Sequence, residues 1–274
     1  MLVKIGAVIV LVAALAAVAG PSLTPFSPSA QDLPMRLEGP TRAHPFGLDE
    51  LGRDVLSRIL AGARISFLVG IVVVSVSAAV GTVLGAMAGY FGGVLDDVIS
   101  RVIDTLLAFP GLLLAIALTA VLGASVRNVV LALCVIGWTG YARLARGEAH
   151  RLRQREFVEA ARALGASDRR ILWRHVAPLL TAPLLVQATF GMAGAIVAEA
   201  SLSFLGLGAQ PPTASWGAML NDGRAFVLVA PHLTIFPGLA IMLTVLAVNL
   251  LGDALRDELD PRLRNSAARP STKS

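Results

Sequence analysis

Long apolar runs constrain this chain more than any other feature of its sequence. Several stretches of about 20 residues carry almost no charge, and a helix needs about that length to cross a bilayer. Hydrophobic residues make up 55% of the 274 positions and charged residues only 15%, which is far more apolar than an ordinary soluble domain. The sequence therefore predicts an all-α, polytopic membrane protein.

Six transmembrane helices are predicted from these runs. Their approximate ranges are 1–20, 65–89, 103–122, 128–142, 181–205 and 233–251. An even number places both termini on one side of the membrane. The excess of Lys and Arg at Lys4, in residues 154–178 and in the tail places that side in the cytoplasm. The arginines between Arg36 and Arg64 oppose this orientation, although long polar loops translocate with less regard to charge.

The first run has two interpretations. Lys4 precedes an apolar stretch, residues 5–19, which ends before Gly20-Pro21. A basic start, an apolar stretch and the small-residue ending Ala17-Val18-Ala19 also describe a cleavable signal peptide. We favour a retained first span, because a start inside the cell agrees with the later arginine pattern.

Residues 154–178, a charged stretch between two apolar runs, predict two short helices joined at a glycine. Helical spacing gives the first helix one apolar face, formed by Phe157, Ala160, Ala161 and Leu164. Gly165 follows at the place where a helix end favours a residue with positive φ. Ser167 is the predicted N-cap of the second helix, and Pro178 is predicted to stop that helix.

The same stretch resembles the EAA loop of the permease subunits of bacterial ATP-binding-cassette importers. The resemblance rests on Glu159-Ala160-Ala161, Gly165 and Pro178, and it departs from the family at Ala177, where a leucine is usual. In that family the loop forms a coupling helix that inserts into a cleft of the ATPase subunit. The resemblance therefore implies an ATPase-coupling role for Glu159, Ala160, Ala161, Gly165, Ala166 and Pro178. A solvated basic loop that only sets topology is the alternative.

Two further stretches resemble one branch of these importers, which transports dipeptides, oligopeptides and nickel. Residues 44–58 are similar to the signature before that branch's second span, and residues 198–220 are similar to a second stretch of the branch. Locally, Asp49 is predicted to cap a helix whose apolar side includes Val55 and Ile59. An amphipathic helix that only anchors the chain at the membrane surface is an alternative. Residues 209–231 are predicted to form an outer loop.

The resemblance implies a non-catalytic permease subunit of an ATP-driven importer in the bacterial inner membrane. Its implied partners are a second permease subunit in a heterodimer, two ATP-binding subunits and a periplasmic or lipid-anchored solute-binding protein, besides membrane lipid. Short peptides are the favoured solute over a nickel chelate or another small solute. The alternative function is an ATP-independent secondary transporter or channel, for which intramembrane ionisable residues would be the hallmark.

Three features inside the predicted spans have more than one interpretation. Gly81, Gly85 and Gly89 would let a second helix approach closely, either within the chain or from a partner subunit. Pro110-Gly111 predicts a loosened helix, which is either a hinge or a packed kink. Glu199 is either a functional residue at membrane depth or a residue at the headgroup layer that pairs with an arginine.

The predicted organisation has three parts. Residues 1–64 hold the first helix and a periplasmic loop, residues 65–254 form a five-helix permease core that contains residues 154–178, and residues 255–274 form a cytoplasmic tail. Phosphate-loop, H-E-x-x-H and G-x-S-x-G motifs are absent from the sequence, which predicts neither catalysis nor a metal site nor a cofactor. The four histidines are scattered and are expected to be surface groups. The arginines concentrate in one loop and the tail, which favours membrane orientation over nucleic-acid binding.

Overall fold

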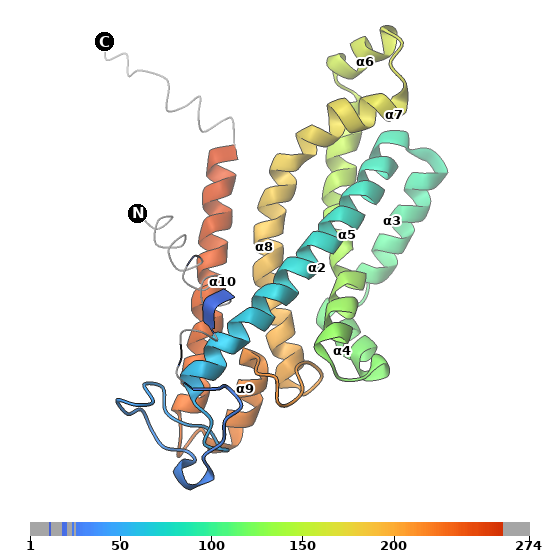
Figure 1. The fold of residues 1–274 in the computed structure, drawn as a ribbon. Coiled ribbons are helices and arrows are strands. Elements are labelled where there is room, and N and C mark those ends of the chain that lie inside the picture. Colours follow the sequence, from blue (N-terminus) through green and yellow to red (C-terminus); the bar gives the residue numbers. More distant parts are fainter. Residues whose placement is uncertain (1–10, 12–17, 21–23, 25, 260–274) are drawn as a thin grey trace, which may run out of the picture.

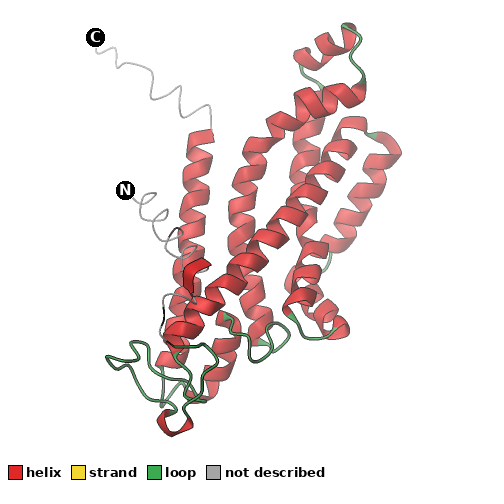
Figure 2. Cartoon of the chain, in the orientation of Figure 1, coloured by secondary structure: helices red, strands yellow, loops and turns green. Residues whose placement is uncertain are grey.

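The computed structural model describes residues 26–259, together with Leu11, residues 18–20 and Thr24, and these form helices joined by loops (Figures 1 and 2). No strand occurs among the described residues, which confirms the predicted all-α fold. The predicted span at residues 1–20, with the question of its cleavage, lies mostly outside these residues.

Four described helices are long and apolar enough to cross a membrane. They are α2 (Val55–Phe91), α5 (Val126–Arg153), α8 (Ala177–Phe204) with the short helices that precede it, and α10 (His232–Leu259). A fifth span is obtained if α3 (Gly93–Leu107) and α4 (Gly111–Leu122), which are bent by 85° at the break between them, count as one. The described part of the chain therefore accommodates the five spans predicted after residue 64.

The loosening predicted at Pro110-Gly111 is a complete break. Helix α3 ends at Leu107, and Pro110, with φ −59° and ψ 119°, is the N-cap of α4. Proline cannot donate the backbone hydrogen bond that would continue α3, and its ring excludes a helical neighbour before it. The chain therefore turns sharply at this point instead of bending smoothly.

Helix α2 begins before the span predicted from residue 65, and Asp49 is not its cap. The N-cap is Asp54, whose carboxylate accepts a hydrogen bond from the Ser57 backbone N–H at 2.8 Å. The Asp49 carboxylate instead accepts hydrogen bonds from the backbone N–H groups of Leu51 and Arg53, both at 2.9 Å, within a turn. Residues 55–64 are therefore the first turns of the span and not a separate surface helix.

The helices extend beyond the predicted spans, and the predicted outer loop contains helical turns. Helix α5 continues past residue 142 to Arg153, and α10 continues past residue 251 to Leu259. Charged residues end an apolar run but remain good helix formers, so the helices extend beyond the apolar segments. The predicted outer loop, residues 209–231, contains α9 (Trp216–Gly223) and a short 3₁₀ turn, η3 (Arg224–Phe226).

The molecule has two contrasting ends (Figure 1). At one end lie two short helices, α6 (Glu156–Ala163) and α7 (Asp168–Ile171); at the other lie α9 and the loop of residues 26–54 with its 3₁₀ turn η1 (Leu33–Met35). At the α9 end, hydrogen bonds join residues that lie far apart in the sequence. The Trp216 indole donates a hydrogen bond to the Ile59 carbonyl at 2.9 Å. His232, predicted to be a surface group, is buried with its Nε2 3.1 Å from the Leu48 carbonyl.

Helices α2 and α5 make the most extensive helix–helix contact of the described chain. Gly81, Gly85 and Gly89 of α2 face α5, and a Cβ at any of them would meet a backbone carbonyl oxygen of that helix. Small residues let helices approach closely in lipid, where apolar burial does not drive association. This stripe therefore packs within the chain.

We expect Gly85→Ala to destabilise the protein by about 1–3 kcal/mol, the usual cost of overpacking a tight contact. The added methyl group would overlap the Ala142 carbonyl on α5. Thermal unfolding in detergent measures the effect. Gly147→Ala is the matched control, because Gly147 is exposed on α5 and a Cβ added there would have no atom within 4 Å. Equal melting temperatures for the two variants would contradict the close contact.

Candidate functional site

The 154–178 segment projects from one end of the helix bundle as α6 and α7 (Figure 1). Most of the predicted apolar face of α6 is not covered by the chain: Phe157, Ala160 and Leu164 are exposed, and the Leu164 side chain is 88% exposed. Helix α6 instead packs through Val158, which is fully buried in a cluster with residues of α2, α5, α7 and α8. A short helix beyond the span ends has only one side against the body, so its remaining apolar residues stay uncovered.

The turn after α6 has the geometry predicted for it. Gly165 has φ +82°, its N–H donates to the Arg162 carbonyl, and the Ala166 N–H donates to the Ala161 carbonyl, each at 3.0 Å. This pair of hydrogen bonds is the Schellman arrangement, which a residue with positive φ completes. Ala161 and Ala166 also pack against the Val158 cluster, so the turn is fixed on the body of the protein.

A second contact holds the segment to the end of α2. The Tyr90 hydroxyl donates a hydrogen bond to Asp168 Oδ1 at 2.8 Å, and Arg162 Nη2 lies 3.3 Å from the same carboxylate oxygen. Asp168 occupies the first turn of α7, where the helix dipole favours a negative charge. Ser167 is the N-cap of α7 by position, but its side chain makes no capping hydrogen bond. Tyr90 and Asp168 therefore link two segments that lie far apart in the sequence.

Pro178 does not stop the second helix. Helix α7 passes through a π-helical turn, η2 (Leu172–Val176), directly into α8, so that residues 168–204 form one continuous helical segment. A proline is tolerated in the first turn of a helix, and a π-turn before it changes the hydrogen-bond register. The 154–178 segment is consequently joined to a membrane-spanning helix without a flexible linker.

The free surface of the 154–178 segment combines apolar groups with charged groups of both signs. Glu159 is exposed and forms no ion pair with any described residue. Beside α6 lies a groove of about 610 Å³ that runs from Leu152 to Phe157 and includes Leu179 of α8. Sequence periodicity missed this groove, because its residues come from three different elements.

Glu199 of α8 is buried, with 1% of its surface exposed. Its carboxylate accepts hydrogen bonds from Ser203 Oγ at 2.7 Å and from Ser66 Oγ of α2 at 3.2 Å. No arginine among the described residues lies within ion-pair distance of it, so the predicted arginine pairing at the headgroup layer is not observed. Glu199 connects α8 to α2 near the α9 end.

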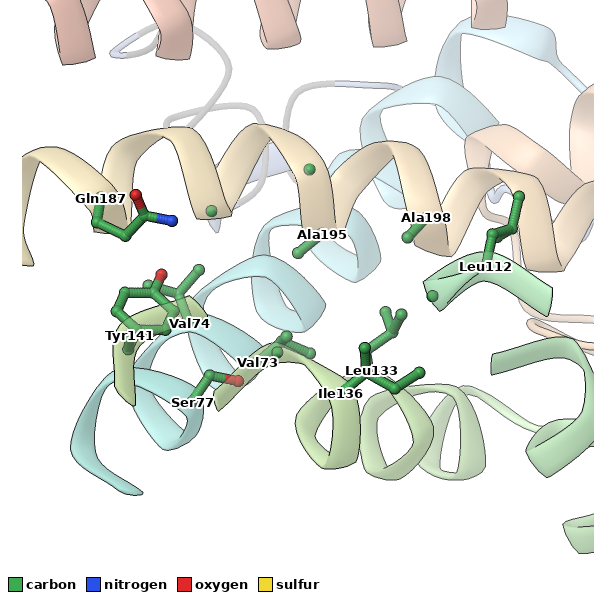
Figure 3. A pocket seen from close by; sticks show the side chains of 14 residues that line it. Val73, Val74, Ser77, Leu112, Leu133, Ile136, Tyr141, Gln187, Ala195 and Ala198 are labelled. Carbon is green, nitrogen blue, oxygen red and sulfur yellow. The ribbon is translucent and has the colours of Figure 1, made fainter. Parts of the chain in front are cut away.

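A cavity of about 280 Å³ lies between α2, α4, α5 and α8 (Figure 3). Its lining is mostly apolar, and the exceptions are Ser77, Tyr141 and Gln187. The sequence did not identify these residues, because the predicted spans are apolar on nearly all sides. No pattern in the sequence marks them, because each faces a glycine of a different helix and this pairing is visible only in the structure: Ser77 lies against Gly137, and Tyr141 lies against Gly191.

A charged cluster at the α9 end consists of Asp49, Glu50, Arg53, Arg58 and Asp222. Arg53 is 2.6 Å from both Asp49 and Glu50, and Arg58 is 3.3 Å from Asp49 and 3.5 Å from Asp222. Burial raises the pKa of the Glu50 and Asp222 carboxyls. The cluster fastens the loop of residues 26–54 to α2 and α9. Among the described residues, no group of three His, Cys, Asp or Glu side chains is placed to hold a metal ion.

Known proteins resemble this chain over most of its length. Residues 81–265 match the family described as "Binding-protein-dependent transport system inner membrane component". The glutathione transport system permease protein GsiD of Escherichia coli O6:K15:H31 is 52% identical over 226 residues, which are 82% of this chain and 75% of that protein. GsiD of Shigella flexneri serotype 5b is 54% identical over the same shares.

The fold is also similar to a solved structure. A chain of the MetNI methionine ABC transporter, in inward-facing conformations, matches with a TM-score of 0.56 and 16% identity, covering 75% of this chain and 96% of that one. At this identity the likeness concerns the arrangement of helices alone.

We expect Tyr90→Phe to loosen the 154–178 segment while leaving the spans intact. The variant removes the hydroxyl that donates a hydrogen bond to Asp168. A hydrogen bond to an exposed carboxylate contributes about 1 kcal/mol to stability. Hydrogen exchange of the backbone amides in residues 156–171 should accelerate about fivefold. Arg151→Gln is the control, because Arg151 pairs with Glu148 on α5 and does not contact the segment. Unchanged exchange in Tyr90→Phe would show that the contact does not hold α7.

Proposed function

The chain belongs to the inner-membrane components of binding-protein-dependent transport systems, and we propose that it forms the translocation pathway for short peptides together with a second, related permease subunit. It is a permease subunit of an ATP-binding-cassette importer and spans the bacterial inner membrane. Its similar relatives are named glutathione permeases. Glutathione, itself a tripeptide, is therefore the first solute to test.

The observation that carries the proposal is the continuity between the 154–178 segment and α8. Helix α6 presents an exposed surface, its turn is fixed by Gly165, and α7 continues through η2 into a spanning helix that lines the central cavity. A subunit that moved α6 would therefore also move α8. This arrangement suits a helix that transmits the closure of an ATPase to a pore.

The orientation of the chain follows from its charges. Arginines gather at the α6 end, on the last turns of α5, at the N-cap of α6 and on α6, α7 and η2: Arg143, Arg146, Arg151, Arg153, Arg155, Arg162, Arg169, Arg170 and Arg174. Fewer arginines, namely Arg36, Arg42, Arg53, Arg58, Arg64, Arg127 and Arg224, lie at the α9 end among the described residues, and the long polar loop of residues 26–54 translocates with less regard to charge. By the positive-inside tendency the α6 end lies in the cytoplasm, with both termini, and the α9 end faces the solute-binding protein.

The transport cycle is a population shift between two states. Two ATP-binding subunits would dock on α6 and on the corresponding helix of the second permease subunit. Their closure around ATP would favour the outward-facing arrangement, because their contacts with the permeases differ between the two states. The solute released by the binding protein would then enter between the spans. ATP hydrolysis belongs to the partner subunits.

We expect the reconstituted complex to import short peptides only when both ATP and the binding protein are present. Proteoliposomes that contain both permease subunits and both ATPases are supplied with labelled glutathione, with a dipeptide or with a nickel chelate. Uptake of the nickel chelate alone would contradict peptide transport. Uptake without ATPase subunits would point to a secondary transporter instead.

We expect Ala160→Trp to abolish retention of the ATPases while the permease folds normally. Ala160 is exposed, so an indole there does not disturb the chain but overfills a closely fitting cleft at a cost of about 1–3 kcal/mol. Glu159→Lys should act similarly by reversing an interface charge. Co-purification of a tagged ATPase measures retention. Ala124→Trp is the control, since Ala124 is exposed in the α4–α5 loop.

Gly165→Val tests the turn separately from the surface. A Cβ added at this position would meet no atom within 4 Å, but φ is +82°, so the cost is backbone strain of about 1 kcal/mol or more. We expect normal membrane insertion with reduced ATPase retention and reduced uptake. Full uptake by the combined Gly165→Val and Glu159→Lys variant would show that the segment only sets topology.

A further inference from the structure

The cavity between α2, α4, α5 and α8 has a polar end and an apolar end. Ser77, Tyr141 and Gln187 gather at one end, whereas Leu112, Leu133 and Ile136 lie at the other (Figure 3). The polar end lies toward α6, because residue numbers rise toward that end along α2 and α5 and fall toward it along α8. The cavity therefore changes character along the direction in which a solute would cross the membrane.

Two hydroxyl groups at the polar end have no partner in the described part of the chain. Ser77 is 1% exposed and Tyr141 is 4% exposed, yet Ser77 Oγ and the Tyr141 hydroxyl form no hydrogen bond with any described residue. A buried polar group without a hydrogen bond destabilises a protein, so nearly all such groups find a partner. These two hydroxyls line a cavity, which points to a partner that enters it.

Two glycines make room for the same hydroxyls. A Cβ at Gly137 would come within 2.6 Å of Ser77 Oγ, and a Cβ at Gly191 would overlap the Tyr141 hydroxyl. Gly137 lies on α5 and Gly191 on α8, so two different helices leave space at this end of the cavity. The placement of both hydroxyls thus depends on backbone positions that carry no side chain.

The lining selects for an uncharged ligand that forms hydrogen bonds. None of the described residues that line the cavity carries a charge, so a carboxylate or an ammonium group would lose its hydration without a counter-charge. Hydroxyls accept hydrogen bonds from N–H groups, and the Gln187 side chain can donate to a carbonyl. A backbone amide offers both groups in one plane, and an apolar side chain next to it would fill the far end.

We propose that this cavity binds one backbone amide of the transported peptide, with the amide N–H donating to the Tyr141 or Ser77 hydroxyl and the adjacent side chain lying among Leu133, Ile136 and Val73. This inference rests on the proposed peptide transport. The volume of about 280 Å³ is near the lower limit of ligand pockets, about 300–1,000 Å³. It suits one or two residues and not a whole peptide. Selectivity in this site would add to that of the binding protein.

The test compares a peptide with its N-methylated analogue. Uptake of each is measured with the complete reconstituted importer and saturating binding protein, and each amide of the peptide is methylated in turn. The ratio of the two rates is then compared between the wild type and Tyr141→Phe, and between the wild type and Ser77→Ala. Discrimination by the binding protein is the same in every variant, so it cancels from this comparison.

For the amide that occupies the cavity, we expect the ratio to fall by about threefold to tenfold in the variant that lacks the accepting hydroxyl, Tyr141→Phe or Ser77→Ala, as the loss of one buried hydrogen bond implies. Thr139→Val is the matched control. Thr139 lies on α5 two residues before Tyr141, is equally buried and donates its hydroxyl to the Ile136 carbonyl at 2.8 Å. The ratio of uptake rates, peptide over N-methylated peptide, should be the same in Thr139→Val as in the wild type.

A stability measurement separates binding from a structural role. Without solute, the melting temperature of the Tyr141→Phe complex should equal or exceed that of the wild type, because the lost hydroxyl has no partner among the described residues. A lower melting temperature would assign the hydroxyl to the fold and overturn the proposal.

Two further results of the uptake measurement separate a failure of the amide site from a failure of the proposed function. If the wild type imports peptides but the ratios do not change in any variant, the cavity holds water or lipid and the amide site is refuted, while the proposed function stands. If the wild type imports no peptide at all, the proposed function fails and the amide site fails with it.

Discussion

The close contact between α2 and α5 is the constraint on which the other features depend. Lipid is as apolar as the side chains, so helices in a membrane gain little by hiding apolar surface from it, and dispersion contacts between close backbones matter more. The glycines of α2 allow this approach, and carbonyls of α5 occupy the space. The contact determines which side of α2 faces α5. Ser77 therefore lies against Gly137, and Tyr90 lies within hydrogen-bond distance of Asp168 at the α6 end.

Helix α8 connects the sites that the structure distinguishes. Its α6 end is continuous with α7, its middle lines the cavity through Gln187, Gly191 and Ala195, and Glu199 is buried near its far end. Pro183 lies inside this helix, between the π-helical turn and the cavity, and removes one backbone hydrogen bond there. The segment between η2 and the cavity is therefore the part of α8 best able to change its bend while both ends stay packed.

Sequence patterns predicted the features that depend on local chemistry. Gly165 has the positive φ that a helix end favours, and the break at Pro110 follows from its missing N–H. Features that depend on which surface is covered were not predictable. Asp49 looked like a helix cap, but Arg53 occupies its carboxylate, and Asp54 caps α2 instead. The buried side of α6 is decided by the body of the protein and not by its own periodicity. Uniformly apolar spans conceal a cavity for the same reason.

Two buried polar sites within the described spans, Glu199 and the pair of hydroxyls at Ser77 and Tyr141, differ in whether the chain supplies their hydrogen bonds. Glu199 has its hydrogen bonds within the chain, from Ser66 and Ser203, and Ser203 Oγ also accepts one from the Ala209 N–H. Such a satisfied network makes one arrangement of α2, α8 and the following loop more favourable than others. The hydroxyls of Ser77 and Tyr141 lack partners among the described residues, so the same physical rule leaves them available to a ligand. The hydrogen-bonded Glu199 carboxylate therefore holds α8 to α2 near the α9 end, whereas the hydroxyls of Ser77 and Tyr141 lie where the cavity leaves space.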